Sequence, residues 1–330
     1  MTEAVDVPQW EPTERDIADA RVTDFARFVQ KRTDVGHPDY HSLWQWSVDD
    51  PAAFWGALWE YFELGDPPAT VLDNPEMPGA RWFPGARLNY VDQIVRNART
   101  DRPAILHATE DGQVAELSWS ELLGRTAAFA KTLRSHGVAA GDRVVGYLPN
   151  IPEAVIAFLA TASIGAIWSA CGQDYSAKAA LDRLGQLEPV VLVTGEEYRY
   201  GGKIHDKRDD VAALQAGLPT LRATVLTTEL TAQAGAHELA TVDVDFDHPL
   251  WILFSSGTTG LPKGIMHGHG GVVLEHLKAV ALQSDIGPAD TFFWYTSPSW
   301  MMWNFQVAGL LVGATTVSYT HLTLPTNREV

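Results

Sequence analysis

A ten-residue segment, Ser255–Gly264, gathers four hydroxyl side chains, three glycines and one lysine. Glycines let a backbone turn tightly and approach a ligand closely. Backbone N–H groups, hydroxyls and a lysine ammonium are together the groups that hold a polyphosphate. The segment therefore predicts a phosphate-binding loop, with a plain Ser/Thr/Gly-rich surface loop as the alternative. An apolar run, Trp251–Phe254, precedes it and has the length and composition of a buried strand.

This loop is not a P-loop of the GxxxxGK[ST] type, because Pro262 and Gly264 stand where that motif needs Gly and Ser or Thr. It resembles the phosphate-binding loop of the acyl-adenylate-forming enzymes, the superfamily of acyl-CoA synthetases, luciferases and peptide-synthetase adenylation domains. The resemblance implies that a substrate carboxylate attacks the α-phosphorus of ATP, so that an acyl-adenylate forms and pyrophosphate leaves. In such a site the protein positions the reactants and stabilises charge.

The resemblance also implies roles for individual residues. The ATP phosphates would be bound by Ser255, Ser256, Gly257, Thr258, Thr259, Gly260 and Lys263. Among these, Lys263 and Thr259 are expected to be catalytic, with Lys263 offsetting the charge on pyrophosphate or holding the loop closed. An exposed, solvated lysine is the alternative for Lys263. The resemblance implies ATP, Mg²⁺ and coenzyme A as cofactor and substrates, and no resident metal site is expected.

The composition of the chain limits the classes of function. Its 330 residues suggest about two domains, and 46% hydrophobic content suffices for a large core. A formal charge of −17 argues against nucleic-acid binding or an anionic membrane surface as the main role, and calls for Mg²⁺ beside an anionic nucleotide. The N-terminus is acidic with no apolar segment behind it, so a cytoplasmic protein is expected. The single cysteine, Cys171, excludes an internal disulfide and is expected to be a packed side chain.

The middle of the chain has the pattern of an α/β domain. Strands are predicted at Ala104–His107, Arg143–Leu148, Ala166–Ala170, Val190–Thr194, Ala223–Thr227 and Thr291–Thr296. Helices are predicted at Trp119–His136, Pro152–Ile164 and Ser176–Gln186. Because strands alternate with helices of this length, the expected fold class is α/β, with layered, mainly parallel sheets flanked by helices.

The N-terminal part has a different composition. One amphipathic helix is predicted at Asp16–Lys31, and five tryptophans follow between residues 44 and 82. Asp49-Asp50-Pro51 is typical of a helix start. The stretches Asp39–Val48 and Trp82–Tyr90 resemble the N-terminal segment of the acetyl-, propionyl- and acetoacetyl-CoA synthetase branch. A small helical, Trp-rich segment is therefore expected before the α/β domain.

Three histidines lie downstream of the loop, His267, His269 and His276. Two histidines at i, i+2 could belong to a metal site, but zinc sites normally need a third ligand at close spacing. A structural or pocket-lining pair between a strand and a helix is the favoured interpretation. The strings His267–Gly271 and Leu274–Lys278 are similar to acetoacetyl-CoA synthetases, more than to acetyl-CoA synthetases.

Two further segments resemble the same family. By this resemblance, the nucleotide end of coenzyme A would be bound by Arg199, Tyr200, Gly201, Gly202 and Lys203. An arginine, a lysine and two glycines can form a phosphate clamp, with a basic surface turn as the alternative. Trp300, Met301 and Met302 are consecutive, and side chains of these types usually lie in a protein core. The resemblance instead implies that they line the acyl pocket.

The resemblance as a whole implies an acetoacetate–CoA ligase, which converts ATP, acetoacetate and CoA to acetoacetyl-CoA, AMP and diphosphate through acetoacetyl-adenylate. An acetyl-, propionyl- or other short-chain acyl-CoA synthetase and a non-catalytic nucleotide-binding fragment are the alternatives. The expected organisation is a polar extension at 1–35, a synthetase-type N-terminal segment at 36–101, a partial AMP-binding domain at 102–316 and a non-native tail at 317–330. Because the family pattern breaks near Ser318, the chain as written is expected to have little or no ligase activity.

Overall fold

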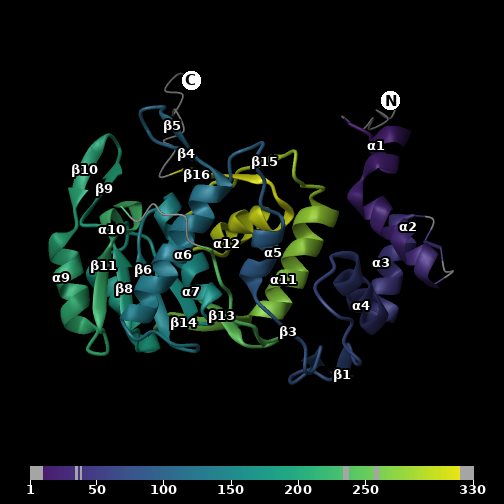
Figure 1. Ribbon diagram of the computed structural model, residues 1–330, viewed down its shortest axis with the longest axis horizontal. Helices are drawn as coiled ribbons and strands as arrows, with labels where there is room; N and C mark the ends of the chain where they lie inside the picture. Colours follow the sequence, from purple (N-terminus) through teal and green to yellow (C-terminus); the bar gives the residue numbers. More distant parts are fainter. Residues whose placement is uncertain (1–9, 34–35, 38, 233–237, 256–259, 320–330) are drawn as a thin grey trace, which may run out of the picture.

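The computed structural model describes residues 10–33, 36–37, 39–232, 238–255 and 260–319. In this part of the chain a six-stranded and a four-stranded sheet lie among helices, and a helical N-terminal region lies to one side (Figure 1). None of the helices described is long and apolar enough to cross a lipid bilayer. The predicted class, an α/β fold with a helical segment before it, is confirmed.

The larger sheet is built from the buried apolar runs that the sequence predicted. In spatial order its strands are β11 (Ala223–Leu226), β8 (Val191–Thr194), β6 (Arg143–Tyr147), β7 (Ile167–Cys171), β13 (Pro249–Ser255) and β14 (Lys263–Gly268). The first five are parallel to one another, and β14 runs antiparallel to β13 at the edge. Continuous runs of buried residues, as in β8 and β7, suit strands that are covered on both faces.

Helices cover both faces of this sheet because successive strand residues point to opposite sides. The helices of this part are α6 (Trp119–Ser135), α7 (Pro152–Ser163), α8 (Ala177–Leu184), α9 (Arg208–Gly217), α10 (Thr227–Ala232) and α11 (His269–Leu277). Val144 packs into the larger core with residues of α6 and α7, whereas its neighbour Val145 packs into a second cluster with residues of α8 and α9. The predicted helix Ser176–Gln186 is shorter than expected, because Ser176 is its N-cap and a 3₁₀ turn, η1 (Gly185–Leu187), ends it.

The smaller sheet has the order β15 (Thr291–Phe292), β16 (Thr315–Tyr319), β4 (Ile105–Ala108) and β5 (Val114–Leu117). The predicted strand Thr291–Thr296 ends early, since only its first two residues pair with β16 and the next three aromatic side chains are exposed. Ser318 and Tyr319 continue β16 in register with β4, and the rest of the predicted tail lies outside the described residues. The proposed boundary at 316 stays a prediction.

The N-terminal region consists of α1 (Glu14–Asp19), α2 (Arg21–Thr33), α3 (Tyr40–Asp49) and α4 (Pro51–Tyr61). The single helix predicted at Asp16–Lys31 was wrong: Ala20 is extended, and the N–H of Arg21 donates to Asp285 instead of continuing the first helix. The predicted helix start is confirmed, because the Asp50 side chain caps α4 and Pro51 is its first residue.

An aromatic stack joins the N-terminal region to the α/β body. Trp59 of α4 stacks on Phe83 at 5.1 Å between ring centroids, and Phe83 stacks on Phe246 at 4.8 Å. Phe246 lies just before β13. The shorter elements around this stack are β1 (Leu72–Asn74), β2 (Arg81–Trp82), β3 (Arg87–Leu88), α5 (Tyr90–Arg96) and β12 (Val244–Asp245). The remaining described elements are η2 (Lys278–Gln283), α12 (Met301–Val307) and η3 (Ala308–Val312).

Candidate active site

The predicted phosphate-binding loop connects β13 to the edge strand β14. Ser255 and Lys263 are directly opposite each other in this antiparallel pair, so they hold the two ends of the loop together. Ser256, Gly257, Thr258 and Thr259 lie outside the described residues. Gly260 has a φ of 116°, a backbone conformation that favours glycine, and Lys263 is exposed at the start of β14. The two ends of the loop are thus defined by a paired β-hairpin.

A side chain that the sequence did not single out contacts this loop. The Nε2 of Gln186, in η1, donates to the carbonyl oxygen of Pro262 at 3.0 Å and to that of Asp182 at 2.6 Å. The contact bridges 76 residues of sequence and fixes the backbone one residue before Lys263. No local pattern around Gln186 predicts this contact, because it joins η1 to a loop that is distant in the sequence.

Beneath the hairpin, Trp251 of β13 is buried among Tyr90, Phe158 and His276. Its indole N–H donates to Nδ1 of His267 on β14 at 3.1 Å. A buried indole that contacts three other rings and also donates a hydrogen bond has little freedom to move. It therefore holds β13 and β14 in register below the loop.

The histidine pair has the structural role that the sequence favoured. The Nδ1 of His269 accepts the backbone N–H of Tyr90 at 3.1 Å, so this ring carries its proton on Nε2. Burial lowers the pKa of His269 to about 3 and that of His276 to about 4, so both rings are neutral near pH 7. Within the residues described there is no group of three or more His, Cys, Asp or Glu side chains placed to hold a metal ion.

The predicted acyl-pocket residues lie at the start of α12, near the carboxyl ends of β6 and β7. The hydroxyl of Ser299 accepts the N–H of Gly172, directly after β7, at 2.7 Å. The indole N–H of Trp303 donates to Asn150, which follows β6, at 3.0 Å. These contacts fix both sides of the first turn of α12 against the sheet. The carboxyl ends of parallel strands are the usual place for ligands in open α/β sheets.

The predicted acyl-pocket side chains are not core residues. Trp300 is 64% exposed and Met301 is 46% exposed, and Met302 is partly buried. Large apolar side chains that are exposed on an anchored turn can contact an apolar ligand group. The structure brings all three together in one turn.

Cys171, by contrast, is fully buried as expected, and burial raises the pKa of its thiol to about 12.

The predicted CoA-binding residues form a separate hairpin, β9 (Glu197–Tyr200) and β10 (Lys203–Asp206), with Gly201 and Gly202 as its turn. Tyr200 and Lys203 are directly opposite each other, whereas Arg199 pairs with Ile204. Because side chains alternate along a strand, Arg199 and Lys203 lie on opposite faces of the hairpin. The ring of Tyr198 stacks on His205 at 5.1 Å on the face of Lys203.

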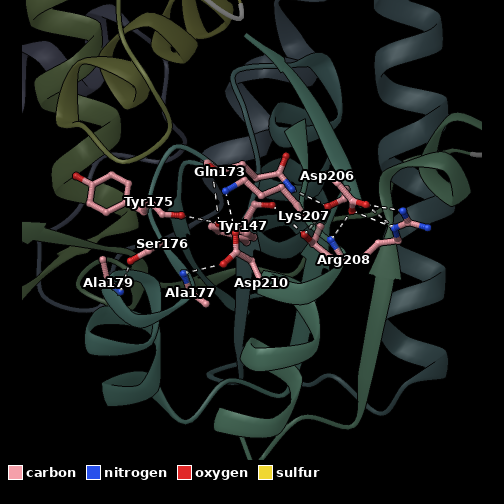
Figure 2. Close-up of polar contacts among 12 residues, drawn as sticks. Tyr147, Gln173, Tyr175, Ser176, Ala177, Ala179, Asp206, Lys207, Arg208 and Asp210 are labelled. Carbon is pink, nitrogen blue, oxygen red and sulfur yellow. Dashed lines mark hydrogen bonds and ion pairs between the residues drawn. The ribbon is translucent and has the colours of Figure 1, made fainter. Parts of the chain in front are cut away.

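A polar network fixes the base of this hairpin (Figure 2). Lys207 forms an ion pair of 2.8 Å with Asp210, whose carboxylate also accepts the N–H of Ala177 at the start of α8 at 3.2 Å. Figure 2 shows Tyr147, at the end of β6, between this pair and the segment after β7. Its hydroxyl donates to the carbonyl oxygen of Tyr175 at 2.6 Å. The sequence analysis singled out none of these side chains.

Ionisation in this network follows from its contacts. Burial raises the pKa of Tyr147, so its hydroxyl stays protonated. Burial tends to raise the pKa of Asp210, but the hydrogen bond and charge of Lys207 and the hydrogen bond from the N–H of Ala177 lower it, and the net shift is downward. Asp206, in an exposed pair with Arg208, has its pKa lowered to about 2 by the hydrogen bond from that guanidinium. The base of the hairpin is therefore held by charged pairs near pH 7.

Two family models match parts of this chain. Residues 92–329 match the family "AMP-binding enzyme", and residues 40–94 match "Acetyl-coenzyme A synthetase N-terminus". The chain is 35% identical to an acetoacetyl-coenzyme A synthetase of Rhizobium meliloti (strain 1021) over 331 residues, which cover 94% of this chain and 51% of the relative. A malonamoyl-CoA synthetase of Penicillium aethiopicum is 34% identical over 336 residues, or 89% of this chain and 45% of the relative.

Among solved structures, the acetoacetyl-CoA synthetase from Streptomyces lividans matches with a TM-score of 0.91 and 48% sequence identity. The match covers 95% of this chain and 51% of that protein. The chain thus spans about half the length of the curated relatives it matches. The family match extends over most of the chain, from before β4 to beyond β16. The chain belongs to the AMP-binding enzyme family.

Proposed function

We propose that this chain forms the ATP- and acid-binding half of an acid–thiol ligase that activates acetoacetate and transfers it to coenzyme A. The reaction is ATP + acetoacetate + CoA → acetoacetyl-CoA + AMP + diphosphate. The observation that carries the proposal is the β13–β14 hairpin, which sets Lys263 opposite Ser255 at the ends of a Ser/Thr/Gly loop. The relatives named acetoacetyl-CoA synthetase support acetoacetate as the acid.

In the first half-reaction the acid carboxylate attacks the α-phosphorus of ATP, the bond to the bridging oxygen breaks, and diphosphate leaves with its electrons. The loop hydroxyls and N–H groups are proposed to hold the β- and γ-phosphates, with Thr259 and Lys263 catalytic. The ammonium of Lys263 offsets the charge that builds up on diphosphate. Mg²⁺ is proposed as the companion of these phosphates, because it offsets the negative charge of the nucleotide.

The acyl group is assigned to the first turn of α12. Trp300, Met301 and Met302 are gathered there, and the flanking contacts from Ser299 and Trp303 hold the turn against the sheet. Large, largely exposed apolar side chains suit the methyl and methylene groups of a short acid. In the second half-reaction the CoA thiol attacks the acyl carbon and releases AMP. The nucleotide end of CoA is assigned to the β9–β10 hairpin, at Arg199–Lys203.

Two other functions remain candidates on specific observations. A different short acid, such as acetate, propionate or another 3-oxo acid, is favoured by the similarity to a synthetase whose name specifies malonamoyl-CoA. A non-catalytic nucleotide-binding role is favoured by the length of the match, which covers about half of each relative.

The decisive experiment uses a hybrid enzyme in which residues 1–316 of this chain replace the matching half of the Streptomyces lividans relative. Acid-dependent exchange of labelled pyrophosphate into ATP reports the first half-reaction without CoA. We expect exchange with acetoacetate well above that with acetate, as in the unaltered relative assayed in parallel. Preference for acetate or propionate would change the assigned acid. A folded hybrid that exchanges with no acid would support the non-catalytic role.

A further inference from the structure

The turn of the β9–β10 hairpin binds a carboxylate from a distant part of the chain. The backbone N–H of Gly201 donates to one carboxylate oxygen of Glu110 at 2.8 Å, and the N–H of Gly202 donates to the other at 2.9 Å. Glu110 precedes Gly201 by 91 residues and lies in the turn between β4 and β5. The tips of the two hairpins lie side by side (Figure 1). One anion thus takes both N–H groups of the turn.

The backbone of this turn is shaped for an anion. Gly201 and Gly202 have φ of 60° and 71°, the left-handed conformation that a two-residue hairpin turn requires at both positions. A Cβ atom added at either residue would meet nothing within 4 Å, so conformation rather than crowding calls for glycine. Successive N–H groups that point to one side form a concave site for a carboxylate or a phosphate oxygen.

The charges around the turn are divided between its two faces. Arg199 pairs with Ile204 and lies on one face of the hairpin. Lys203 lies on the other face, beside the stacked rings of Tyr198 and His205. In this conformation the carboxylate of Glu110 is the anion that the turn holds, and both basic side chains lie at its margins.

We propose that Glu110 is a latch: its carboxylate fills an anion site at Gly201–Gly202, and a ligand phosphate that binds the hairpin turn must displace it. The anion site itself rests on the two hydrogen bonds. Its use by the nucleotide end of CoA rests on the proposed function. A phosphate offers three acceptor oxygens and more negative charge than a carboxylate, so it can compete with Glu110 for the two N–H groups.

The latch has a measurable consequence for affinity. A site that is available only when the latch is open binds its ligand more weakly, by the fraction of time that it is open. If the latch is closed about 90% of the time, removing it strengthens phosphate binding about tenfold. A contact that merely shaped the hairpin would act in the opposite direction, because its loss would disorder the site.

The first experiment observes the turn itself, using the full chain labelled with ¹⁵N-glycine. The amide signals of Gly201 and Gly202 are assigned by substitution and followed during titration with inorganic phosphate. Both signals should move in Glu110→Gln and Glu110→Ala before phosphate is added, because a charged acceptor is lost. Phosphate should then shift them at about tenfold lower concentration than in the unaltered chain. Unchanged signals, or a phosphate midpoint that is equal or higher in both variants, would overturn the latch.

Asp111→Asn is the matched control, because it removes the same charge from the same turn. Asp111 accepts hydrogen bonds from Thr109 and Gln113 within that turn and none from the two glycines. It should leave the glycine signals in place and change the phosphate midpoint by less than about twofold, since the exposed charge is screened. If Asp111→Asn changed the glycine signals and the phosphate midpoint as much as Glu110→Gln does, the loss of any nearby negative charge would explain the result, and the latch would be overturned.

The second experiment separates the latch from the proposed function. Calorimetric titration with adenosine 3′,5′-bisphosphate, which reproduces the nucleotide end of CoA, should show about tenfold tighter binding to Glu110→Gln than to the unaltered chain. If inorganic phosphate binds the freed glycines but the bisphosphate binds neither protein, the latch stands and the assignment of CoA to this hairpin fails. If neither ligand reaches the glycines in the variants, the latch itself fails.

Discussion

Two glycine-containing hairpins, β13–β14 and β9–β10, are positioned in different ways. β13 is an interior strand of the six-stranded sheet, paired on both sides, and its residues Leu250–Ile252 are buried. The β9–β10 hairpin is a separate two-stranded unit that side chains hold to the body, through Lys207 and Asp210 at its base and Glu110 at its tip. A loop fixed by a buried strand suits the reactive phosphates, whereas a hairpin held by reversible polar contacts suits a ligand that arrives second.

The largest expected effect concerns Lys263 at the first hairpin. In the hybrid enzyme, Lys263→Ala should slow acetoacetate-dependent pyrophosphate exchange by about 10²–10³-fold, the usual loss when one charge-stabilising donor is removed. Exchange rates at saturating ATP and acid give the measurement. Lys178→Ala is the control, because that lysine is 89% exposed on α8 and pairs with Asp182 one helical turn away. Equal exchange rates in both variants would show that Lys263 is an exposed, solvated lysine with no role in the reaction.

The second prediction uses pH to distinguish the two regions. His269, below the first hairpin, has a folded pKa of about 3 against about 6.5 when unfolded. The unfolded chain therefore binds more protons below pH 6.5, so this contribution to stability is complete above that pH and falls as the pH drops toward 3. The free energy of unfolding should decrease by about 1.4 kcal/mol per pH unit for each such histidine.

Chemical unfolding at pH 7 and pH 5 measures this slope, and His269→Asn should reduce it while keeping an acceptor for the N–H of Tyr90. The ion pair of the second hairpin behaves differently. The pKa of Asp210 is lowered in the folded protein, so its contribution is present above the unfolded value of about 3.9 and is lost only below it. If His269→Asn leaves the pH dependence of the unfolding free energy unchanged, the folded protein does not lower the pKa of the His269 ring.

The third prediction loosens the second hairpin alone. Lys207→Ala or Asp210→Asn should raise the KM for CoA of the hybrid about tenfold, as expected for a hydrogen bond to a charged group worth about 1.5 kcal/mol. Pyrophosphate exchange, which needs no CoA, should stay the same. Arg208→Ala removes the neighbouring exposed pair and should change neither quantity. A parallel loss of exchange in the Lys207 and Asp210 variants would mean that the base of this hairpin also supports the first half-reaction.

The smallest effect is expected at Gln186. Gln186→Ala should slow exchange about fivefold, because it removes one neutral hydrogen bond of about 1 kcal/mol to the backbone beside Lys263. Gln215→Ala, which removes an exposed contact to Thr224, serves as the control. If the two variants are equally active, the β13–β14 pairing alone fixes this end of the loop.

The first strand of the first hairpin was predictable from the sequence because its determinants are local. A buried apolar run predicts a strand, and that strand is present as β13, whereas the pairing with β14 was not predicted. The capping residue Asp50 and the parallel strands were predictable for the same reason. In the first helical stretch, by contrast, an amphipathic pattern concealed a break at Ala20, since the contact of Arg21 with Asp285 comes from the far end of the chain.

The contacts of the second hairpin could not be predicted, because each joins residues that are distant in sequence. The residue types of Arg199–Lys203 suggested a clamp, but the strand register sets the two basic side chains on opposite faces. The carboxylate of Glu110 occupies the turn, and nothing near Glu110 in the sequence predicts its glycine partners. The hydrophobic periodicity of the sequence predicts the helices and strands and their buried faces, whereas tertiary packing decides which hairpin tips come into contact.

The most direct test of the division between the hairpins is Lys203→Ala in the hybrid enzyme, with both half-reactions measured on one preparation. Pyrophosphate exchange is followed without CoA, and thioester formation is followed as CoA is varied. If the second hairpin serves only the second half-reaction, exchange stays within about twofold, and the KM for CoA rises about tenfold for the loss of one charged contact. Loss of exchange comparable to that of Lys263→Ala, or an unchanged KM for CoA, would contradict the account.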